Sequence, residues 1–407
     1  MTRRALGALL LAPIALGGAP LAAETHVIAP GEGAQERLQE ALILAEPGDE
    51  IVIEAGRYTL TDGLSLDVDG VTVRGAGPAQ SVLDFTSQQG AGEGLLVTSD
   101  EVTLRDFALE NPKGDGIKSK GADNIVYHRI RVTWTGGPKP ENGAYGIYPV
   151  ESTGVLVSHS QVSGASDAGI YVGQSTKITV RNSIATDNVA GIEIENSRDA
   201  VVTDNYVTRN TGGILVFDLP GLPVMGGGNV LVKNNLVSGN NTPNFAPPGN
   251  IVGGVPRGTG IMVMANEKVW VEDNVVMDNP TAPFMVIAYT QAFDDPRYNP
   301  YPREVVIAGN TVDEGANDPD LPGGAMLLAA FGGTLPPLVT DGLADPDSAD
   351  VPALAAHPDI PGWSLGLSRQ GQPLDEAQPA PFDAPAYTSP WDMQGIGAPA
   401  ALAARLK

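Results

Sequence analysis

Four side chains that can exchange protons occupy one position of a recurring Gly-Ile-x-apolar unit. As the unit recurs, x is Lys118, Tyr148, Tyr171 and then Glu193. Ammonium groups, phenols and carboxyls act as general acids and bases once their surroundings shift their pKa. We expect these four side chains to be catalytic, with a tyrosine as base, Lys118 lowering that phenol's pKa, and Glu193 or Lys118 as acid.

A second set of residues flanks these positions and is predicted to bind a substrate. Glu195 follows Glu193 on the same predicted strand, with their backbones about 7 Å apart, so Glu193 could also pair with Glu195 or Asp167 as the two carboxyls of a glycoside hydrolase. The predicted binding residues are Asp115, Lys120, Tyr145, Glu151, Asp167, Glu195 and Phe217.

The positions of these residues depend on a repeat. The Gly-Ile units beginning at Gly146, Gly169, Gly191 and Gly213 are spaced by 23, 22 and 22 residues. Between them lie alternating segments such as "KITVRNSIA" and "AVVTDNYVT". Alternation indicates strands, and so short a repeat buries its apolar face only by stacking on its neighbours. The sequence therefore predicts an all-β, right-handed parallel β-helix.

Asparagines and insertions give this solenoid a predicted register and a predicted groove. We expect a stack of buried asparagines on one side of successive coils, formed by Asn182, Asn205, Asn235 and Asn274. In the Gly-Ile-x units Ile points into the core and x points outward, so x forms a column on one outer face. Four insertions adjoin the strand that carries this column and would wall a groove along it; they are 135–144, 218–228, 240–258 and 290–304.

The remaining segments complete the predicted domain organisation. Residues 1–23 have the basic start, apolar run and small residues of a signal peptide, which predicts a periplasmic or secreted protein. Residues 24–312 form the β-helix, beginning with a capping helix that buries Leu38 and Leu42. Residues 313–407, rich in Pro, Asp and Ala, are expected to pack on the last coils or to be partly disordered.

Charge and composition exclude several classes of function. The formal net charge is −24, which argues against binding to nucleic acid or to an anionic membrane surface. There is no cysteine, so disulfides, covalent haem and thiolate-bound zinc are excluded. Residues 101–140 nevertheless contain seven bases and five acids, so this end of the groove could hold an anionic sugar.

The repeats resemble those of the pectin-lyase-like superfamily. "YGIYPVES" is similar to the Tyr-Gly-Phe-Asp-Pro-His-Asp signature of mannuronan C5-epimerases, with Tyr145, Gly146 and Pro149 matching. Tyr148 and Val150 stand where the signature has Asp and His, so that family's acid/base pair is not carried over.

Other motifs resemble an exported family of parallel β-helix repeat proteins. They include "GDGIKSKGADN", "GASDAGIYVGQS" and "GGILVFDLPGLPV". Genes of this family tend to lie beside those of c-type cytochrome-like proteins, which implies a periplasmic protein partner. A weaker resemblance links the chain to periplasmic copper-associated β-helix proteins.

Three functions are compatible with these features. The first is an enzyme that acts on an acidic, uronate-containing polysaccharide as a lyase, a C5-epimerase or a glycoside hydrolase. The second is a non-catalytic module that binds a glycan or a protein partner. The third is metal handling, with Met225, Met262, Met264 and Met285 offering thioethers to copper. No cofactor is predicted, although Glu193, Glu195 and Asp167 carry oxygen ligands that suit calcium.

Overall fold

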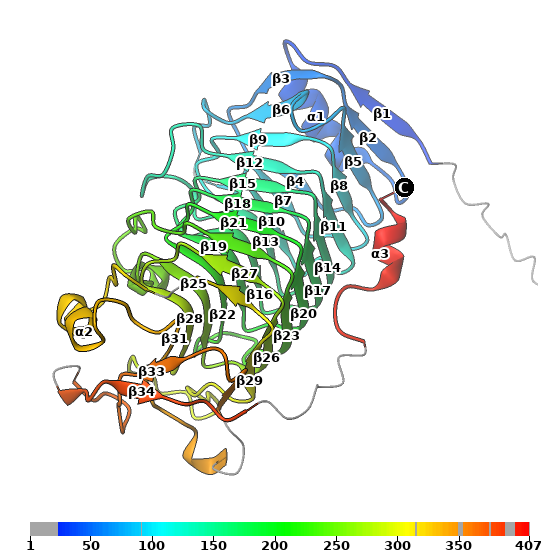
Figure 1. The fold of residues 1–407 in the computed structure, drawn as a ribbon. Helices are drawn as coiled ribbons and strands as arrows, with labels where there is room; N and C mark the ends of the chain where they lie inside the picture. Colours follow the sequence, from blue (N-terminus) through cyan, green and yellow to red (C-terminus); the bar gives the residue numbers. More distant parts are fainter. Residues whose placement is uncertain are drawn as a thin grey trace, which may run out of the picture.

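The structure is a computed structural model that describes residues 23–90, 92–313, 316–348, 353–373, 376–386 and 395–406. The described chain winds into a right-handed parallel β-helix, in which three long sheets run along one axis (Figure 1). The predicted fold class is therefore confirmed. The predicted signal peptide, 1–23, lies outside the described residues apart from Ala23.

Most coils contribute one strand to each of three sheets, named A, B and C here. Sheet A contains, in spatial order, β1 (Thr25–Ile28), β2 (Glu50–Ile53), β5 (Thr72–Gly75), β8 (Thr103–Arg105), β11 (Ile125–His128), β14 (Thr153–Ser158), β17 (Thr176–Arg181), β20 (Arg198–Thr203), β23 (Gly228–Lys233), β26 (Glu267–Glu272), β29 (Val305–Ala308) and β32 (Leu354–Ala356).

Sheet B is built from shorter strands that follow those of sheet A. They are β3 (Gly56–Thr59), β6 (Ser81–Asp84), β9 (Ala108–Glu110), β12 (Arg131–Thr133), β15 (Gln161–Ser163), β18 (Ile184–Thr186), β21 (Tyr206–Thr208), β24 (Leu236–Ser238), β27 (Val275–Met277) and β30 (Thr311–Val312).

Sheet C carries the Gly-Ile units. Its strands are β4 (Leu64–Leu66), β7 (Leu95–Val97), β10 (Ile117–Lys120), β13 (Tyr145–Val150), β16 (Ala168–Gly173), β19 (Ala190–Glu195), β22 (Gly212–Phe217), β25 (Thr259–Met264), β28 (Ala282–Ile287), β31 (Leu338–Thr340), β33 (Gly362–Ser364) and β34 (Ala380–Phe382). β34 pairs with β33 antiparallel, whereas the other strand pairs are parallel.

The core lies inside the three sheets and is made of aliphatic columns. Ile147 pairs with Ile170, Ile170 with Ile192, and Ile192 with Ile214 across successive strands of sheet C. These isoleucines are fully buried, as the period-2 pattern predicts for the inward face of a strand. The residue that follows each of them therefore points outward, which fixes the register of the outer column.

Two asparagine stacks support the turns between strands. In the first, Asn205 Nδ2 donates to Asn235 Oδ1 over 2.9 Å and Asn235 Nδ2 to Asn274 Oδ1 over 3.0 Å. Asn310 continues this stack. The second stack follows the strands of sheet B and was not anticipated; it contains Asn188, Asn210, Asn240 and Asn279.

The placement of Asn182 in the first stack is wrong by one residue. Ser183 occupies that level, and its backbone N–H donates to Asn205 Oδ1 over 3.0 Å. Asn182 instead has a left-handed φ of 49°, as Asp204 has on the next coil with 57°. Asn and Asp adopt this conformation more readily than other side chains. Because asparagine suits both the turn and the stack, aligning asparagines alone shifts the register.

A helix covers the N-terminal end of the solenoid, and further short helices lie along the remainder of the described chain. α1 (Ala34–Leu44) buries Ala34, Leu38 and Leu42 against the first coil, which confirms the predicted capping helix. The others are η1 (Ile251–Gly254), α2 (Gly324–Ala330), η2 (Pro346–Ser348) and α3 (Ala400–Ala404).

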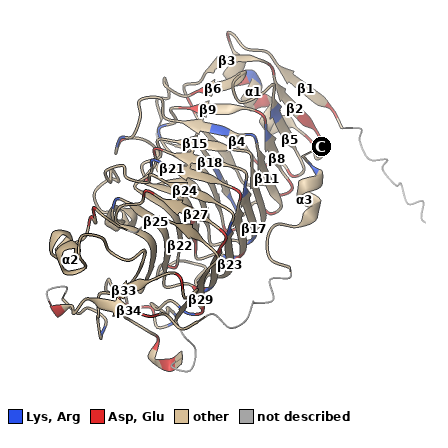
Figure 2. Ribbon diagram, viewed as in Figure 1, with Lys and Arg blue, Asp and Glu red and all other residues tan. Residues whose placement is uncertain are grey.

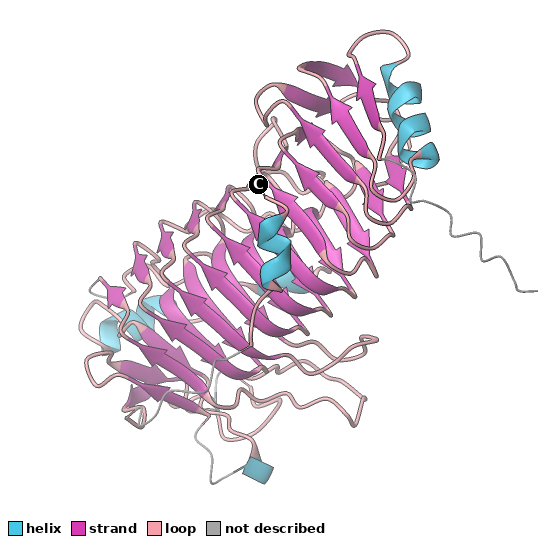
Figure 3. Ribbon diagram, turned by 90° about the vertical axis from the view of Figure 1, so that its right-hand side faces the viewer, coloured by secondary structure: helices cyan, strands magenta, loops and turns pink. Residues whose placement is uncertain are grey.

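The chain beyond residue 312 contributes further strands and then runs back along the solenoid. β31, β32 and β33 extend sheets C and A past the point at which the sequence period fades. α3 lies across the outer surface of sheet A (Figure 3), where Leu402 packs on Val126 and Leu156. Arg405 also donates to the carbonyl oxygens of Glu101 and Asn124.

Charge is distributed along the whole solenoid. Lys and Arg are interspersed with Asp and Glu in the described part of the chain (Figure 2). None of the helices in that part is both long and apolar enough to cross a membrane.

The Asn205 side chain should be needed for stability. Asn205→Ala removes the partner of the buried Ser183 N–H and the side-chain donor to Val180 O, and it leaves Asn235 Oδ1 with only the backbone N–H of residue 205. We therefore expect a loss of about 1–3 kcal/mol in the free energy of unfolding. Asn182→Gly is the control, because glycine accepts the left-handed turn. Equal losses in the two variants, measured by urea denaturation, would contradict this assignment.

Candidate functional site

The predicted outer column exists on sheet C. Tyr171 pairs with Glu193, Glu193 with Leu215, and Leu215 with Met262 across neighbouring strands. Lys118 pairs with Tyr148 at the N-terminal end. The column therefore changes along the solenoid from basic and aromatic to acidic and then to apolar, and the aromatic and acidic part lines a cleft.

Three tyrosines form an aromatic cluster in this cleft. The ring centroids of Tyr145 and Tyr148 lie 4.4 Å apart, those of Tyr145 and Tyr171 4.6 Å, and those of Tyr148 and Tyr171 4.9 Å. Tyr145 and Tyr148 come from β13 and Tyr171 from β16. Such a cluster presents an aromatic wall with hydroxyl groups, which suits a ligand with both apolar faces and polar edges.

Three carboxyl groups lie beside the tyrosines. Asp167 precedes β16, and Glu193 and Glu195 lie on β19. Tyr145 OH and Asn250 Nδ2 each approach Asp167 Oδ2 at 3.4 Å, and Tyr171 hydrogen-bonds Glu195. Glu193 Oε1 is buried and has no hydrogen-bond partner among the described residues. One carboxyl oxygen in the cleft is thus a hydrogen-bond acceptor that the described residues leave unused.

Burial shifts the pKa of all three carboxyls upward. Loss of solvent raises the pKa of Asp167 and of Glu195 to about 7, because the charged form is disfavoured away from water. Burial first, and then the charges of Asp167 and Glu195, raise the pKa of Glu193 well above its ordinary value. At neutral pH the cluster therefore retains protons and can both donate and accept them.

The insertions explain why outward-pointing residues are buried. Glu193 is 1% exposed, Glu195 7% and Tyr171 4%, although all three point away from the solenoid core. The predicted groove floor is therefore covered as well as flanked by the insertions. Leu219 and Leu222 of insertion 218–228, and Asn250, Ile251 and Val252 of insertion 240–258, cover these three residues and complete a cleft of about 340 Å³.

Asparagine and aspartate side chains hold these insertions in place. Asn196 Nδ2 donates to Leu219 O and its Oδ1 accepts from Leu219 N, over 2.9 and 2.8 Å. Asp218 accepts from Gly227 N over 2.7 Å. In the other insertion, Asn244 Nδ2 donates to the carbonyl of Val252 over 3.0 Å. Each covering loop is thereby tied to the coil beneath it or closed on itself.

Gly173 makes room for Tyr171. A Cβ at residue 173 would lie 2.3–2.6 Å from the hydroxyl and ring atoms of Tyr171. The Tyr171 ring therefore folds along its own strand, over Gly173, toward Glu195, which pairs with Gly173 on the next strand. The absence of a side chain at residue 173 is what lets the phenol reach a carboxyl of the cluster.

The predicted site residues do not all meet in the cleft. Tyr145, Tyr148, Asp167, Tyr171, Glu193, Glu195 and Phe217 line it together. Lys118 and Asp115 lie at its margin, with Lys118 Nζ 3.2 Å from Glu93 Oε1 and 3.8 Å from Asp115 Oδ2. Lys120 and Glu151 pair with each other at 3.5 Å and are not among the residues that line the cleft.

The prediction that Lys118 lowers the pKa of a neighbouring phenol is wrong. Lys118 Nζ lies 5.1 Å from the centre of the Tyr148 ring, yet burial and neighbouring carboxylates raise the pKa of Tyr148 to about 12. The pKa values of Tyr145 and Tyr171 are raised further for the same first cause, burial. Protonated phenols donate hydrogen bonds, so at neutral pH the carboxyls are the better proton acceptors.

Several cleft residues were missed by sequence reasoning. Gln174, Leu219, Leu222 and Asn250 line the cleft, and three of them belong to insertions. The insertions themselves were the available signal, but their sequences do not say which side chain folds inward. Within the described residues, no group of three or more His, Asp or Glu side chains is arranged to hold a metal ion.

Comparison with known proteins identifies the fold. Residues 69–219 match the family model for the right-handed beta helix region, and this stretch contains β13, β16, β19 and β22. The chain is also 25% identical over 222 residues to the preneck appendage proteins of Bacillus phages PZA and phi29, across 46% of this chain and 26% of each relative. It thus spans about a quarter of the length of these relatives.

Solved structures of two enzymes share the architecture. The mannuronan C-5 epimerase A-module of Azotobacter vinelandii superposes with a TM-score of 0.50 and 17% identity, over 76% of this chain and 86% of that one. A DFA-IIIase of Arthrobacter chlorophenolicus gives a TM-score of 0.52 and 13% identity, over 82% and 95%. At this identity the similarity establishes the fold alone, a right-handed β-helix.

The contact between Tyr171 and Gly173 can be tested by a double-mutant cycle. Gly173→Ala should cost about 1–3 kcal/mol in the free energy of unfolding, because the new methyl group overlaps the phenol. In a Tyr171→Ala background the same change should cost less than about 0.5 kcal/mol, since the space is then empty. Equal costs in both backgrounds, measured by chemical denaturation, would show that the ring does not occupy this space.

The buried carboxyls should make stability depend on pH. Carboxyls whose pKa is raised by folding stabilise the protein fully below their unfolded pKa, and this contribution is lost as the pH rises through the folded value. The melting temperature should therefore fall between about pH 5 and pH 8. Glu193→Gln should reduce that fall, whereas Glu54→Gln, at an exposed glutamate outside the cleft, should not. If the melting temperatures of wild type and Glu193→Gln fall equally over this pH range, the raised pKa of Glu193 is contradicted.

Proposed function

We propose that the cleft binds a glycan and hydrolyses a glycosidic bond with Asp167 and Glu195 as its carboxyl pair. One observation carries the proposal: carboxyls with pKa values of about 7 lie beside a cluster of three tyrosines in one covered cleft. A general acid and a general base must each hold the right protonation state near the working pH. Carboxyls that titrate near neutrality meet this requirement, and aromatic walls suit sugar rings.

The proposed reaction uses both protonation states of the pair. One carboxyl, protonated, donates its proton to the glycosidic oxygen as the bond to the anomeric carbon breaks. The other, ionised, accepts a proton from the water that attacks this carbon, and the products carry the two new hydroxyl groups. Glu193 lines the same cleft, and its own raised pKa keeps a further negative charge out of it. Tyr145 and Tyr171 position the two carboxyls.

The charge of the cleft favours a neutral glycan over a uronate polymer. A uronate carboxylate needs a cation beside it, and both lysines of β10, Lys118 and Lys120, are already paired with carboxylates. A lyase or C5-epimerase would also need a base for the C5 proton, and the phenols keep their protons at neutral pH. Acidic polysaccharides therefore remain the second substrate class to test, at the margin near Lys118.

Replacement of either carboxyl should abolish hydrolysis without unfolding the protein. Asp167→Asn and Glu195→Gln should each lower the rate by about 100-fold or more, while Glu54→Gln keeps the wild-type rate. The assay follows new reducing ends with a panel of neutral oligosaccharides and polysaccharides, and circular dichroism verifies folding.

The same panel separates the alternatives. Uronate polymers are included, and their unsaturated ends are followed by ultraviolet absorbance. If uronate polymers give this absorbance and neutral glycans give no new reducing ends, the protein is a lyase and the proposed hydrolysis is contradicted. Glycan retention without any cleavage would leave a non-catalytic binding module, the alternative predicted from the sequence.

A further inference from the structure

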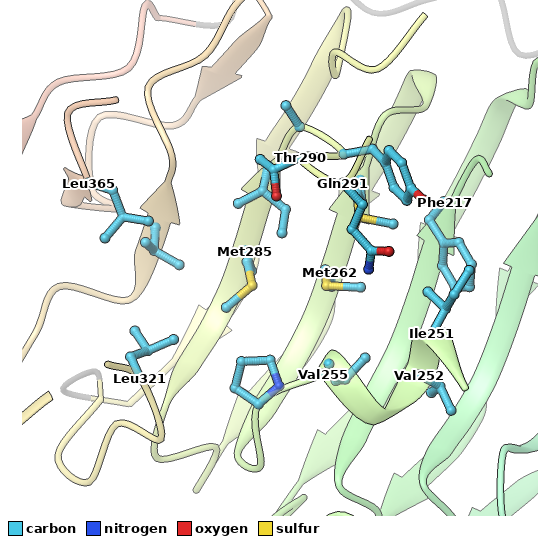
Figure 4. Close-up of a pocket in the computed structure, with 17 residues that line it drawn as sticks. Phe217, Ile251, Val252, Val255, Met262, Met285, Thr290, Gln291, Leu321 and Leu365 are labelled. Carbon is cyan, nitrogen blue, oxygen red and sulfur yellow. The ribbon is translucent and has the colours of Figure 1, made fainter. Parts of the chain in front are cut away.

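A second cavity lies on the outer face of sheet C, on the C-terminal side of the cleft. It has a volume of about 250 Å³ and is lined by Met262, Met264 and Met285, together with Phe217 and Tyr289. Figure 4 shows Met262 and Met285 side by side on neighbouring strands, with Thr290 and Gln291 along one edge. The described residues that line it include no charged side chain.

This cavity adjoins the carboxyl cleft. Phe217, Ile251 and Val252 line both spaces, so the cleft and the cavity lie directly beside each other. The register explains the change of character, because Glu193 is followed in the outer column by Leu215, Met262 and then Met285. One continuous surface is thus acidic and hydroxyl-rich at one end and apolar at the other.

Four separate segments of the chain enclose the apolar end. Val255 and Pro256 follow η1, and Thr290 and Gln291 follow β28. Leu321 precedes α2 and Leu365 follows β33, both beyond residue 312, where the sequence repeat fades. Met262 and Met285 are each only 5% exposed. The segments that close the cavity therefore shelter it from water without filling it.

The size and the lining of the cavity suit an aromatic ring. An apolar cavity of about 150 Å³ is large enough to bind benzene, and this one has about 250 Å³, which leaves room for a substituent. Thioether sulfurs make favourable contacts with aromatic rings, and methionines lie on two adjacent strands. Thr290 and Gln291 can hydrogen-bond a polar group at the rim.

We propose that the methionine-lined cavity is a subsite for an aromatic ring carried by the glycan that the cleft binds. The ligand class is then an aryl glycoside or an aromatic ester of a sugar, with its sugar beside Tyr145 and Tyr171 and its ring beside Met262 and Met285. This inference rests on the proposed function for the sugar part, whereas the ring part rests on the cavity alone.

A pair of neighbouring glycines provides a matched test. Gly254 lines the cavity, and a Cβ there would meet no atom within 4 Å, so Gly254→Phe can occlude the cavity. Gly253→Phe is the control, because Gly253 does not line the cavity and its Cβ would make only an ordinary contact at 3.8 Å with Ala246. The probe is 4-fluorophenol, whose binding is followed by line broadening in ¹⁹F NMR spectra.

The expected result is broadening of the probe signal by wild type and Gly253→Phe, and loss of that broadening with Gly254→Phe. Among disaccharide glycosides, the 4-fluorophenyl derivative of a bound sugar should bind at least tenfold more tightly than the methyl derivative, and only Gly254→Phe should remove this gain.

Two results would overturn the inference. Unbroadened probe with wild type, together with a higher melting temperature of Gly254→Phe, would show an internal packing void. Equal affinity of aryl and methyl glycosides would show that the cavity does not serve the ligand of the cleft. Failure of hydrolysis alone, with the cavity-dependent gain in affinity retained, would contradict the proposed reaction and support the aromatic subsite.

Discussion

In-register pairing of parallel strands is the constraint on which the rest of this structure depends. Each strand of sheet C repeats the alternation of its neighbour, so Ile170 lies over Ile192 and Tyr171 beside Glu193. A shift by one residue would turn the isoleucines outward and the charged residues into the core. The buried isoleucine columns and asparagine stacks therefore hold the outer column in register, although these residues do not belong to the outer face of sheet C.

The insertions convert this outer column into a chemical site. On a bare solenoid, Glu193 and Glu195 would be solvated and ionised at neutral pH. Segments 218–228 and 240–258 remove water from them, and removal of water raises their pKa. The protein thus separates two tasks: the coils set the spacing of the carboxyls and tyrosines, and the loops set the protonation state.

The same face changes character over a short distance. Where the column passes from Glu193 to Leu215, the covering loops stop enclosing carboxyls and begin to enclose methionines. Phe217, Ile251 and Val252 form the boundary between the two spaces. A solenoid permits such a gradient because neighbouring coils share a register but need not share the type of side chain that points outward.

The sequence by itself determined the fold, the capping helix and the order of residues along the outer face, because period-2 alternation and a 22-residue repeat leave few ways to bury the apolar side chains. It misplaced Asn182, since asparagine suits both the turn and the stack. The tertiary structure alone decided that Glu193 is buried, that Tyr171 folds over Gly173, and that Asn250 reaches Asp167. Burial by a distant loop depends on how that loop folds back, and no local pattern of residues records it.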